Sequence, residues 1–466
     1  MRLRAESWLI DRVKQVLETL KKTIANLSEP QTRSQERYRS IALSAIAATV
    51  AKLVSAAMGI LSAPIVVHHL GKEQFGLWMV VSSLVIWLQL AEFGIANGLS
   101  NALAEAHGRN DSQAASGYLS SAIAATVVVA ILCLPLLAIA YYGLNWVRIL
   151  NLANPELARK ASDALLVAGL AFIVNIPLSL AARAFLAYQR SYVSSYLQVG
   201  ASVATVAGLW IAVELDLGLT WFVGIAAFVP MTANLFLWFG LSKLDARLTL
   251  GIDQVKRSAL SRVAASSVPL FLFQVGALLL NQLVNLVIAR TATLSLVADY
   301  NVVLRIYIFV FAIAAGLSNP FYAAIREASE KGDTRWASKA VQHSLAVRLL
   351  ATFPFAATLL IAGDVLLKWW IGQSIAPPIG HWGWACVGLS LFLSATSSLL
   401  SEVLSCLDDI WAQVGVVFLS AATVLGLLYI LIPVLGVPGV FVAMAVSTIF
   451  PLGWSYRRLK RRFAHA

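Results

Sequence analysis

The sequence predicts an all-α polytopic membrane protein with twelve transmembrane helices in two six-helix lobes. Three observations support this fold class. Hydrophobic residues make up 59% and charged residues 12% of the 466 residues, whereas soluble domains are about 45–50% apolar and about 25% charged. Apolar runs long enough to cross a bilayer as helices follow one another from Ile41 onward. Separate sequence matches recur at one offset of 218 residues, which indicates that a six-span unit was duplicated.

The repeat is visible at three places. The triplet LSN occurs at 99–101 and 317–319, SVATVAGL at 202–209 matches SAATVLGL at 420–427, and Leu-Gly recurs at 217–218 and 435–436. An even number of spans gives both copies the same orientation, so the lobes should be related by a pseudo-two-fold axis along the membrane normal. This arrangement suits alternating access around a central cavity, and it favours a transporter over a membrane enzyme.

Polar turns divide the chain into its expected spans. We place the spans at 41–67, 75–102, 117–142, 161–187, 192–213, 219–241, 262–289, 295–325, 337–363, 382–405, 410–432 and 437–455. The predicted units are an N-lobe (41–241), a cytoplasmic linker (242–261), a C-lobe (262–455) and a basic cytoplasmic tail (456–466).

Residues 1–40 are predicted to form a cytoplasmic amphipathic segment. Apolar residues between Leu9 and Leu27 follow helical spacings of 3 and 4 and form one stripe, with charged residues largely off it. A helix lying on the membrane surface fits this pattern. The alternative is a helix packed on a cytosolic partner or on the protein's own loops. The segment lacks the short apolar core of a signal peptide.

The distribution of Lys and Arg predicts the orientation. Of the 35 basic residues, 25 fall on the side that holds the two termini and 6 on the opposite side. Both termini are therefore expected in the cytoplasm. The net charge of +12 is then largely a topology signal, and we do not expect nucleic-acid binding. No catalytic or metal-binding motif is visible, and the three cysteines suggest neither a metal site nor a disulfide framework.

Charged side chains inside apolar spans are the candidate functional residues. Such charges are costly at bilayer depth and usually face the protein interior. The basic ones are Lys52, Arg183, Arg305 and Arg348, and the acidic ones are Glu92, Asp299 and Glu402. Polar residues that we expect to line the same cavity are Gln274, Asn281, Asn285 and Asn301.

Two interpretations of these residues remain open. They can pair and hydrogen-bond to hold helices together, with long side chains reaching the headgroups. Alternatively, several cations converge on an anionic group of a substrate, for which Arg and phosphate match best. Lys52 and Arg305 are the deepest and the strongest candidates. The carboxylates are candidates for coupling to H⁺ or Na⁺, and the alternative for each is a plain ion pair.

Three segments carry a family resemblance. LGKEQFGLW (Leu70–Trp78), AEFGIANGLSNALAEAHGRND (Ala91–Asp111) and GVPGVFVAMAVS (Gly436–Ser447) resemble the polysaccharide transport family of the multidrug/oligosaccharidyl-lipid/polysaccharide (MOP) exporter superfamily. The similarity is closest to Wzx-type O-antigen and exopolysaccharide repeat-unit flippases. That family often has Asp before the Phe-Gly or Leu-Gly of span 2, where this chain has Glu92.

The resemblance implies a flippase of the bacterial cytoplasmic (inner) membrane that moves undecaprenyl-diphosphate-linked oligosaccharides to the outer leaflet. Implied partners are this polyprenyl-linked glycan, membrane lipids, a polysaccharide polymerase and a chain-length regulator, with no cofactor. The resemblance also implies that a cationic cavity holds the diphosphate, and Lys52, Arg183, Arg305 and Arg348 are the cations that could do so. The alternatives are a cation-coupled multidrug exporter of the same superfamily and a membrane polysaccharide polymerase or ligase.

Overall fold

A computed structural model of the chain describes residues 33–464, apart from 88–93, 151–154, 266–267, 374 and 408. All regular structure within these ranges is helical, and the all-α prediction is confirmed. Most of the predicted amphipathic segment 1–40, together with Glu92, lies outside the described residues.

The helices divide between the two halves of the sequence. The first half contains α2 (Arg33–Ile86), α3 (Ile95–Gly108), α4 (Ser112–Gly143), α5 (Trp146–Ile149), α6 (Pro155–Leu178), α7 (Leu180–Ala187), α8 (Ser191–Glu214) and α9 (Leu219–Leu244). The connection holds the short turn η2 (Ile252–Gln254) and α10 (Arg257–Ala265). The second half contains α11 (Val268–Thr291), α12 (Leu294–Glu330), α13 (Thr334–Ile371), α14 (Gly380–Cys406), α15 (Trp411–Leu435) and α16 (Val437–Ala464).

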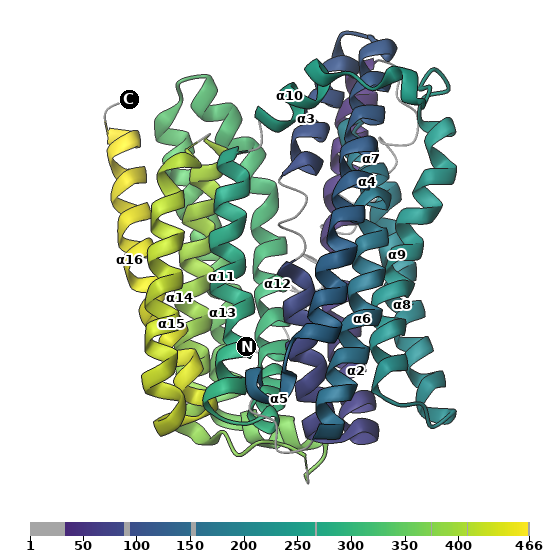
Figure 1. Ribbon diagram of the computed structural model, residues 1–466. Helices are drawn as coiled ribbons and strands as arrows, with labels where there is room; N and C mark the ends of the chain where they lie inside the picture. The colour runs from purple at the N-terminus through teal and green to yellow at the C-terminus, as the bar shows by residue number, and fades with distance from the viewer. Residues whose placement is uncertain are drawn as a thin grey trace, which may run out of the picture.

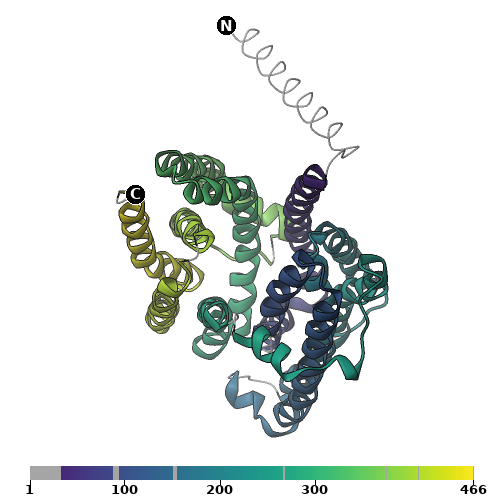
Figure 2. The ribbon, with the colours of Figure 1, turned by 90° about the horizontal axis from the view of Figure 1, so that it is seen from above.

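The two halves of the sequence form two lobes that stand side by side. Figure 1 shows the purple-to-teal helices packed together in one lobe and the green-to-yellow helices in the other, and Figure 2 shows the same division from above. The predicted two-lobed architecture is confirmed. Helix α10 packs on α3 and α4 of the N-lobe, so the start predicted for the C-lobe at residue 262 falls inside a helix that contacts the N-lobe.

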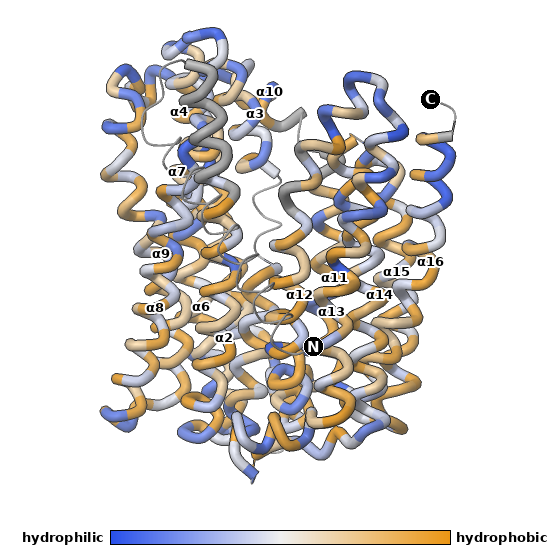
Figure 3. The backbone as a smooth tube through the Cα atoms, turned by 180° about the vertical axis from the view of Figure 1, so that it is seen from behind, coloured by the Kyte–Doolittle hydropathy of each residue, from blue (hydrophilic) through white to orange (hydrophobic). Residues whose placement is uncertain are grey.

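The outer surface of the bundle is apolar over most of its height. Within the described residues, eleven helices are long and apolar enough to cross a membrane. Figure 3 shows a hydrophobic body with hydrophilic ends. Large side chains such as Ile361, Trp369 and Val434 are 76–84% exposed, which suits contact with lipid rather than water.

The second predicted span, 75–102, is not one continuous helix. Helix α2 contains the first span and the first part of the second, joined by a bend at Gly71 (φ 77°, ψ 167°). It ends at Ile86, and α3 begins at Ile95. Gly94 has φ 73°, a left-handed conformation that does not occur inside an α-helix, so a new helix starts after it. The sequence of this span is apolar enough to predict a single helix despite Gln89, Glu92 and Gly94.

Both copies of the LSN segment end at the same structural feature. Asp111 caps α4 by accepting a hydrogen bond from the backbone N–H of Ala114 at 2.8 Å, and Asp333 caps α13 by accepting one from Trp336 at 3.0 Å. The residue before each cap, Asn110 or Gly332, has a positive φ. The two helices thus begin with one turn geometry, as a duplicated unit predicts.

The hydrophobic core differs between the two ends of the molecule. We call the end with the α3–α4 turn, α10 and the C-terminus the basic side, and the other end the opposite side. Near the opposite side a single cluster joins residues of both lobes, for example Val66 and Phe75 with Ile288 and Val303. Near the basic side each lobe has its own cluster, around Leu103 and Phe185 in the N-lobe and around Leu400 and Val403 in the C-lobe. The lobes therefore meet near the opposite side and diverge toward the basic side (Figure 1).

Candidate functional site

Helices α2 and α12 form the main contact between the lobes. Small residues let them approach closely, as is usual where membrane helices pack. A Cβ atom at Gly316 of α12 would lie only 2.8 Å from Cγ2 of Thr49 on α2. Gly59 follows Thr49 by ten residues on α2, and a Cβ atom added there would lie 3.8 Å from Nη1 of Arg305. Charged groups on this seam contact both lobes at once.

Arg305 reaches from α12 across the seam to α2. Its Nη1 donates hydrogen bonds to the carbonyl oxygen of Gly59 and to Oγ of Ser62, the latter at 2.7 Å. The guanidinium also lies 5.6 Å from the centre of the Phe75 ring, a cation–π distance. Its Nε and Nη2 have no acceptor among the described residues, and within that part of the chain no carboxylate pairs with it. Arg305 is thus held in place while three of its five N–H groups stay open to a ligand.

Lys52 lies on the same face of α2 as Gly59. The separation of seven residues is two helical turns, or about 10 Å along the axis. The side chain is exposed, and the described residues offer it no hydrogen-bond or ion-pair partner. Lys52 and Arg305 are therefore two uncompensated cations beside one seam, and their role in anion binding stays a prediction.

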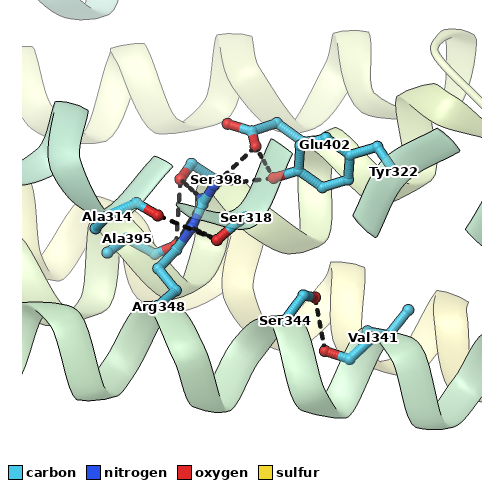
Figure 4. Close-up of polar contacts among 9 residues, drawn as sticks. All are labelled: Ala314, Ser318, Tyr322, Val341, Ser344, Arg348, Ala395, Ser398 and Glu402. Atoms are coloured by element: carbon cyan, nitrogen blue, oxygen red, sulfur yellow. Dashed lines mark hydrogen bonds and ion pairs between the residues drawn. The ribbon is translucent and has the colours of Figure 1, made fainter. Parts of the chain in front are cut away.

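Arg348 has a different environment. Its side chain is fully buried in the C-lobe between α12, α13 and α14 (Figure 4). Its five N–H groups donate to Ser318 Oγ (3.0 Å), the Ala395 carbonyl (3.2 Å), Ser398 Oγ (2.8 Å), the Tyr322 hydroxyl (2.9 Å) and Glu402 Oε2 (3.0 Å). The Tyr322 hydroxyl donates to the same Glu402 oxygen. In this conformation Arg348 has no N–H left for a substrate.

The Arg348 cluster therefore matches the interpretation as an ion pair that holds helices together. The charges of Arg348 and Glu402 pair at 3.0 Å, and three hydroxyl groups and the Ala395 carbonyl accept the other guanidinium N–H groups. Sequence reasoning identified Arg348 and Glu402 but not Ser318, Tyr322 and Ser398. A signal was present: Ser318 and Tyr322, like Ser398 and Glu402, are four residues apart and share a helix face.

Arg183 is on α7 in the N-lobe, where that helix packs on α3 and α9. The side chain is half-buried, and the described residues hold no acceptor for it. It stays a candidate cation, but no contact links it to the α2–α12 seam. Glu92, a carboxylate predicted as a candidate for ion coupling, lies outside the described residues.

The predicted polar stripe on α11 divides into two parts. Asn285 is buried and donates to Ser83 Oγ of the N-lobe at 2.6 Å, while its own oxygen accepts from Asn301 at 2.8 Å. Asn281 is exposed and donates to the Ala277 carbonyl of its own helix at 2.7 Å. Gln274 is half-buried. Asn285 and Asn301 thus join the lobes, whereas Asn281 is free to face a ligand with its amide oxygen.

Asp299 closes the lobes near the opposite side. It pairs with Lys72 of α2 at 2.8 Å, and both side chains are mostly covered. A short distance away, Gly76 lies so close to α12 that a Cβ would be 2.0 Å from the Leu294 carbonyl oxygen. Together with the Ser83–Asn285 hydrogen bond, these contacts seal the lobes on this side. Lys72 and Ser83 were not singled out from the sequence, because Lys72 reads as a loop charge and one buried serine carries no signal.

Reversing one charge of the Lys72–Asp299 pair is expected to part the lobes near the opposite side. In Lys72→Glu, two carboxylates would face each other where the pair now lies at 2.8 Å, and like charges repel. Spin labels at Asp216 in the N-lobe and Trp369 in the C-lobe, both exposed, should report a longer distance. The double reversal Lys72→Glu/Asp299→Lys should restore the original distance. An unchanged distance in Lys72→Glu would show that the pair does not hold the lobes together.

Gly76→Ala is expected to destabilise the closed interface directly. The added methyl group would meet a backbone carbonyl of α12, which cannot rotate away as a side chain can. Overpacking of this kind costs about 1–3 kcal/mol. Thermal unfolding of the purified protein should show a lower Tm than the parent. Gly200→Ala is the matched control, because a Cβ there meets no atom within 4 Å; equal Tm values for the two variants would contradict the close approach.

The C-lobe contains a pocket near the basic side. Its volume is about 290 Å³, and α11, α14, α15 and α16 line it. Seven serines, Thr448, Asn281 and Gln413 lie in its wall, whose exposed area is largely apolar and includes Phe273, Leu280, Val416, Val417, Pro451 and Trp454. None of the four candidate cations lines this pocket, so it is separate from the α2–α12 seam.

The family described as "Polysaccharide biosynthesis protein" matches residues 41–320, which include the whole N-lobe and the Arg305 region of α12. Among curated proteins, no sequence matches this chain significantly.

Solved structures share the fold at low sequence identity. An inward-facing multidrug resistance MATE family transporter of the MOP superfamily is similar with a TM-score of 0.76 and 15% identity, over 90% of this chain and 98% of that one. An outward-facing structure of such a transporter is similar with a TM-score of 0.64 and 15% identity, over 92% of this chain and 97% of that one. A MOP superfamily transporter from Pyrococcus furiosus is similar with a TM-score of 0.65 and 14% identity, over 91% of this chain and 96% of that one. Its binding pocket is described as having reverse polarity. These similarities establish a two-lobed transporter fold.

Proposed function

Because this chain belongs to the polysaccharide biosynthesis protein family and has the fold of MOP superfamily transporters, we propose that it is a lipid-linked oligosaccharide flippase. The cargo is an oligosaccharide repeat unit on undecaprenyl diphosphate. The protein moves it from the cytoplasmic to the outer leaflet of the bacterial cytoplasmic membrane. A polysaccharide polymerase and a chain-length regulator then act on the delivered units.

The observation that carries this proposal is the environment of Arg305. A diphosphate needs cationic donors that are fixed in place and not already neutralised, and guanidinium N–H groups match phosphate oxygens best. Arg305 is anchored on α2 by Gly59 and Ser62 yet keeps three N–H groups open. Lys52 adds a second unpaired charge on the same face of α2. The oligosaccharide would extend from the diphosphate between the lobes.

The arrangement of the lobes supports a loading conformation. Both lobes share a core near the opposite side and have separate cores near the basic side. If the basic side is cytoplasmic, as the Lys and Arg distribution predicts, the lobes diverge toward the leaflet in which the cargo is made. The greater similarity to the inward-facing than to the outward-facing transporter agrees with this orientation.

The proposal includes coupling of transport to H⁺ or Na⁺. Among the described residues, Glu402 is the carboxylate that we propose for this coupling. Only one of its oxygens is engaged, by Arg348 and Tyr322, and 38% of its side chain is exposed. Asp299 is bound to Lys72 in this conformation and would become available only when the lobes part near the opposite side.

Export of cationic drugs is the second candidate, since the similar solved structures include multidrug transporters. A cationic drug needs an acidic site. In the described part of the chain, Asp299 and Glu402 are already paired with cations, while the charges left unpaired on the seam are basic. This charge balance favours an anionic cargo.

Reconstitution tests the two functions against each other. The purified full chain in proteoliposomes should accelerate the transbilayer movement of a labelled polyprenyl-diphosphate oligosaccharide, and a polyprenyl monophosphate should compete poorly. A strain that lacks the gene should lose surface polysaccharide without becoming sensitive to cationic drugs. Drug sensitivity with unchanged polysaccharide would overturn the proposal and support the drug exporter.

A further inference from the structure

The C-terminal end of α16 forms a basic hollow beside the C-lobe pocket. Arg457, Arg458, Arg461 and Arg462 surround it together with Asp409 and Trp454, and its volume is about 600 Å³. Trp454 also lines the 290 Å³ pocket, so the two spaces are neighbours with one shared wall. Neither contains Arg305 or Lys52, the residues of the proposed transport site.

One arginine of the hollow is fixed and three are free. Arg458 donates to both carboxylate oxygens of Asp409, at 2.9 Å from Nη2 to Oδ1, and stacks 5.6 Å from the centre of the Trp454 ring. These contacts neutralise Arg458 and hold the shared wall in position. Arg457, Arg461 and Arg462 are exposed and have no acceptor among the described residues. Three unpaired guanidinium groups beside one fixed arginine are suited to phosphate oxygens.

The adjoining pocket presents hydrogen-bond acceptors. Ser420 donates to the Val416 carbonyl at 2.9 Å, and Ser447 and Thr448 both donate to the Met444 carbonyl, at 2.8 and 2.7 Å. Because each hydroxyl proton is used within its own helix, the oxygen lone pairs remain for a ligand. The pocket suits a neutral group rich in O–H donors, and Trp454 and Phe273 add aromatic faces. Its volume is at the low end of ligand pockets, about 300–1,000 Å³.

We propose that these two spaces form a second binding site for a lipid headgroup that joins a phosphate to a small hydroxyl-rich group. The phosphate lies against Arg457, Arg461 and Arg462, and the hydroxyl groups enter the serine-lined pocket past Trp454. Two kinds of lipid carry this chemistry: a sugar on polyprenyl diphosphate, and a phospholipid with a glycerol headgroup. The site goes beyond the proposed transport site, because it lies within one lobe and is complete without the seam.

A topology signal alone would not produce this arrangement. Positive charges on a cytoplasmic tail need only be near the membrane end. They need neither a carboxylate that fixes one of them nor an aromatic wall shared with a hydroxyl-lined pocket. Basic pockets between membrane helices on the cytoplasmic side are suited to anionic lipid headgroups.

Binding to the purified full chain tests the site. The probes are polyprenyl-diphosphate N-acetylglucosamine, phosphatidylglycerol, polyprenyl diphosphate without sugar, and phosphatidylcholine, titrated by native mass spectrometry. The Arg457→Gln/Arg461→Gln variant should weaken binding of the first three by about tenfold, and Arg457→Lys/Arg461→Lys, which keeps the topogenic charge, by less. The matched control Arg335→Gln removes an exposed arginine of α13 and should leave the binding of every probe unchanged.

The pocket is tested separately. Ser420→Ala/Ser447→Ala removes two acceptors without stranding a donor, so the protein should fold normally. This variant should bind the sugar lipid and phosphatidylglycerol more weakly than the parent does. Its binding of the sugar-free diphosphate should be unchanged. Thr423→Ala is the matched control, since Thr423 makes the same helix contact at a half-buried position that does not line the pocket. Tighter binding of the sugar lipid than of phosphatidylglycerol identifies the cargo as the ligand, and the reverse order identifies the phospholipid.

Two results would overturn the proposal. One is unchanged lipid binding in the arginine variant, and the other is an equal loss of sugar-lipid binding in Ser420→Ala/Ser447→Ala and in Thr423→Ala. Failure of this site is distinguishable from failure of the proposed function. Arg305→Gln should lose transport but keep binding of phosphatidylglycerol and of the two diphosphate lipids at the α16 site.

Discussion

Replacing Arg305 and Lys52 together by glutamine is expected to abolish surface-polysaccharide output while the protein still folds and reaches the membrane. Both side chains are uncompensated cations beside the α2–α12 seam. A hydrogen bond between charged partners contributes about 1.5–3 kcal/mol, so losing two such donors weakens diphosphate binding by about a hundredfold or more. The measurement is polysaccharide output from a strain that carries only the variant, together with transport in proteoliposomes.

The single variants separate charge from geometry. Arg305→Gln removes the charge and the Nη1 donor, and the Tm should stay near normal because the Lys72–Asp299 pair and the Ser83–Asn285 hydrogen bond still join the lobes. Arg305→Lys keeps the charge but loses the planar fork, and we expect intermediate transport. Arg335→Gln, at an exposed position in the first turn of α13, should transport normally. Full polysaccharide output from the double variant would refute the assignment of Arg305 and Lys52 to the substrate site.

Glu402→Leu is expected to be the most destabilising single substitution among the candidate residues. It leaves the fully buried Arg348 without its counter-charge (Figure 4), and removing one partner of a buried ion pair costs about 3–5 kcal/mol. Arg348→Met should cost less, because Glu402 is 38% exposed and can contact water or take up a proton. The readout is thermal unfolding and the yield of folded protein.

The double variant Arg348→Met/Glu402→Leu distinguishes a structural pair from a functional one. Replacing both charges by apolar groups of similar size is often neutral for stability, so the Tm should recover most of the loss seen in Glu402→Leu. Transport should recover with it if the pair only holds α12, α13 and α14 together. Recovered stability with no transport would instead assign Glu402 to ion coupling.

The two-lobed fold was predictable because its signals are local or periodic. Apolar runs mark the spans, and the 218-residue offset marks the duplication; the matching caps at Asp111 and Asp333 confirm that the copies share a turn. The break between Ile86 and Ile95 was not predictable, because the left-handed Gly94 lies in a sequence that reads as a continuous span.

The candidate site was predictable only as a set of residues. Cost at bilayer depth identifies Arg305 and Arg348 alike, and the greater depth of Arg305 in its span does not show what either side chain contacts. Their different roles depend on which helix faces they meet: Arg348 meets Glu402, 54 residues away, while Arg305 meets the carbonyl of Gly59, 246 residues away. Helix rotation and the packing of distant segments decide such pairings, as they decide the contact between Ser83 and Asn285.

The shared core near the opposite side also makes the conformational balance sensitive to temperature. Closing that side buries apolar side chains of both lobes, such as Phe75 and Val303, in one cluster. Hydrophobic association weakens on cooling, since it is driven by entropy near room temperature and carries a large heat-capacity change. Cold therefore loosens the closed side more than it weakens the Lys72–Asp299 pair or the Ser83–Asn285 hydrogen bond. A cell growing at low temperature would depend increasingly on these polar contacts to keep the membrane sealed between transport cycles.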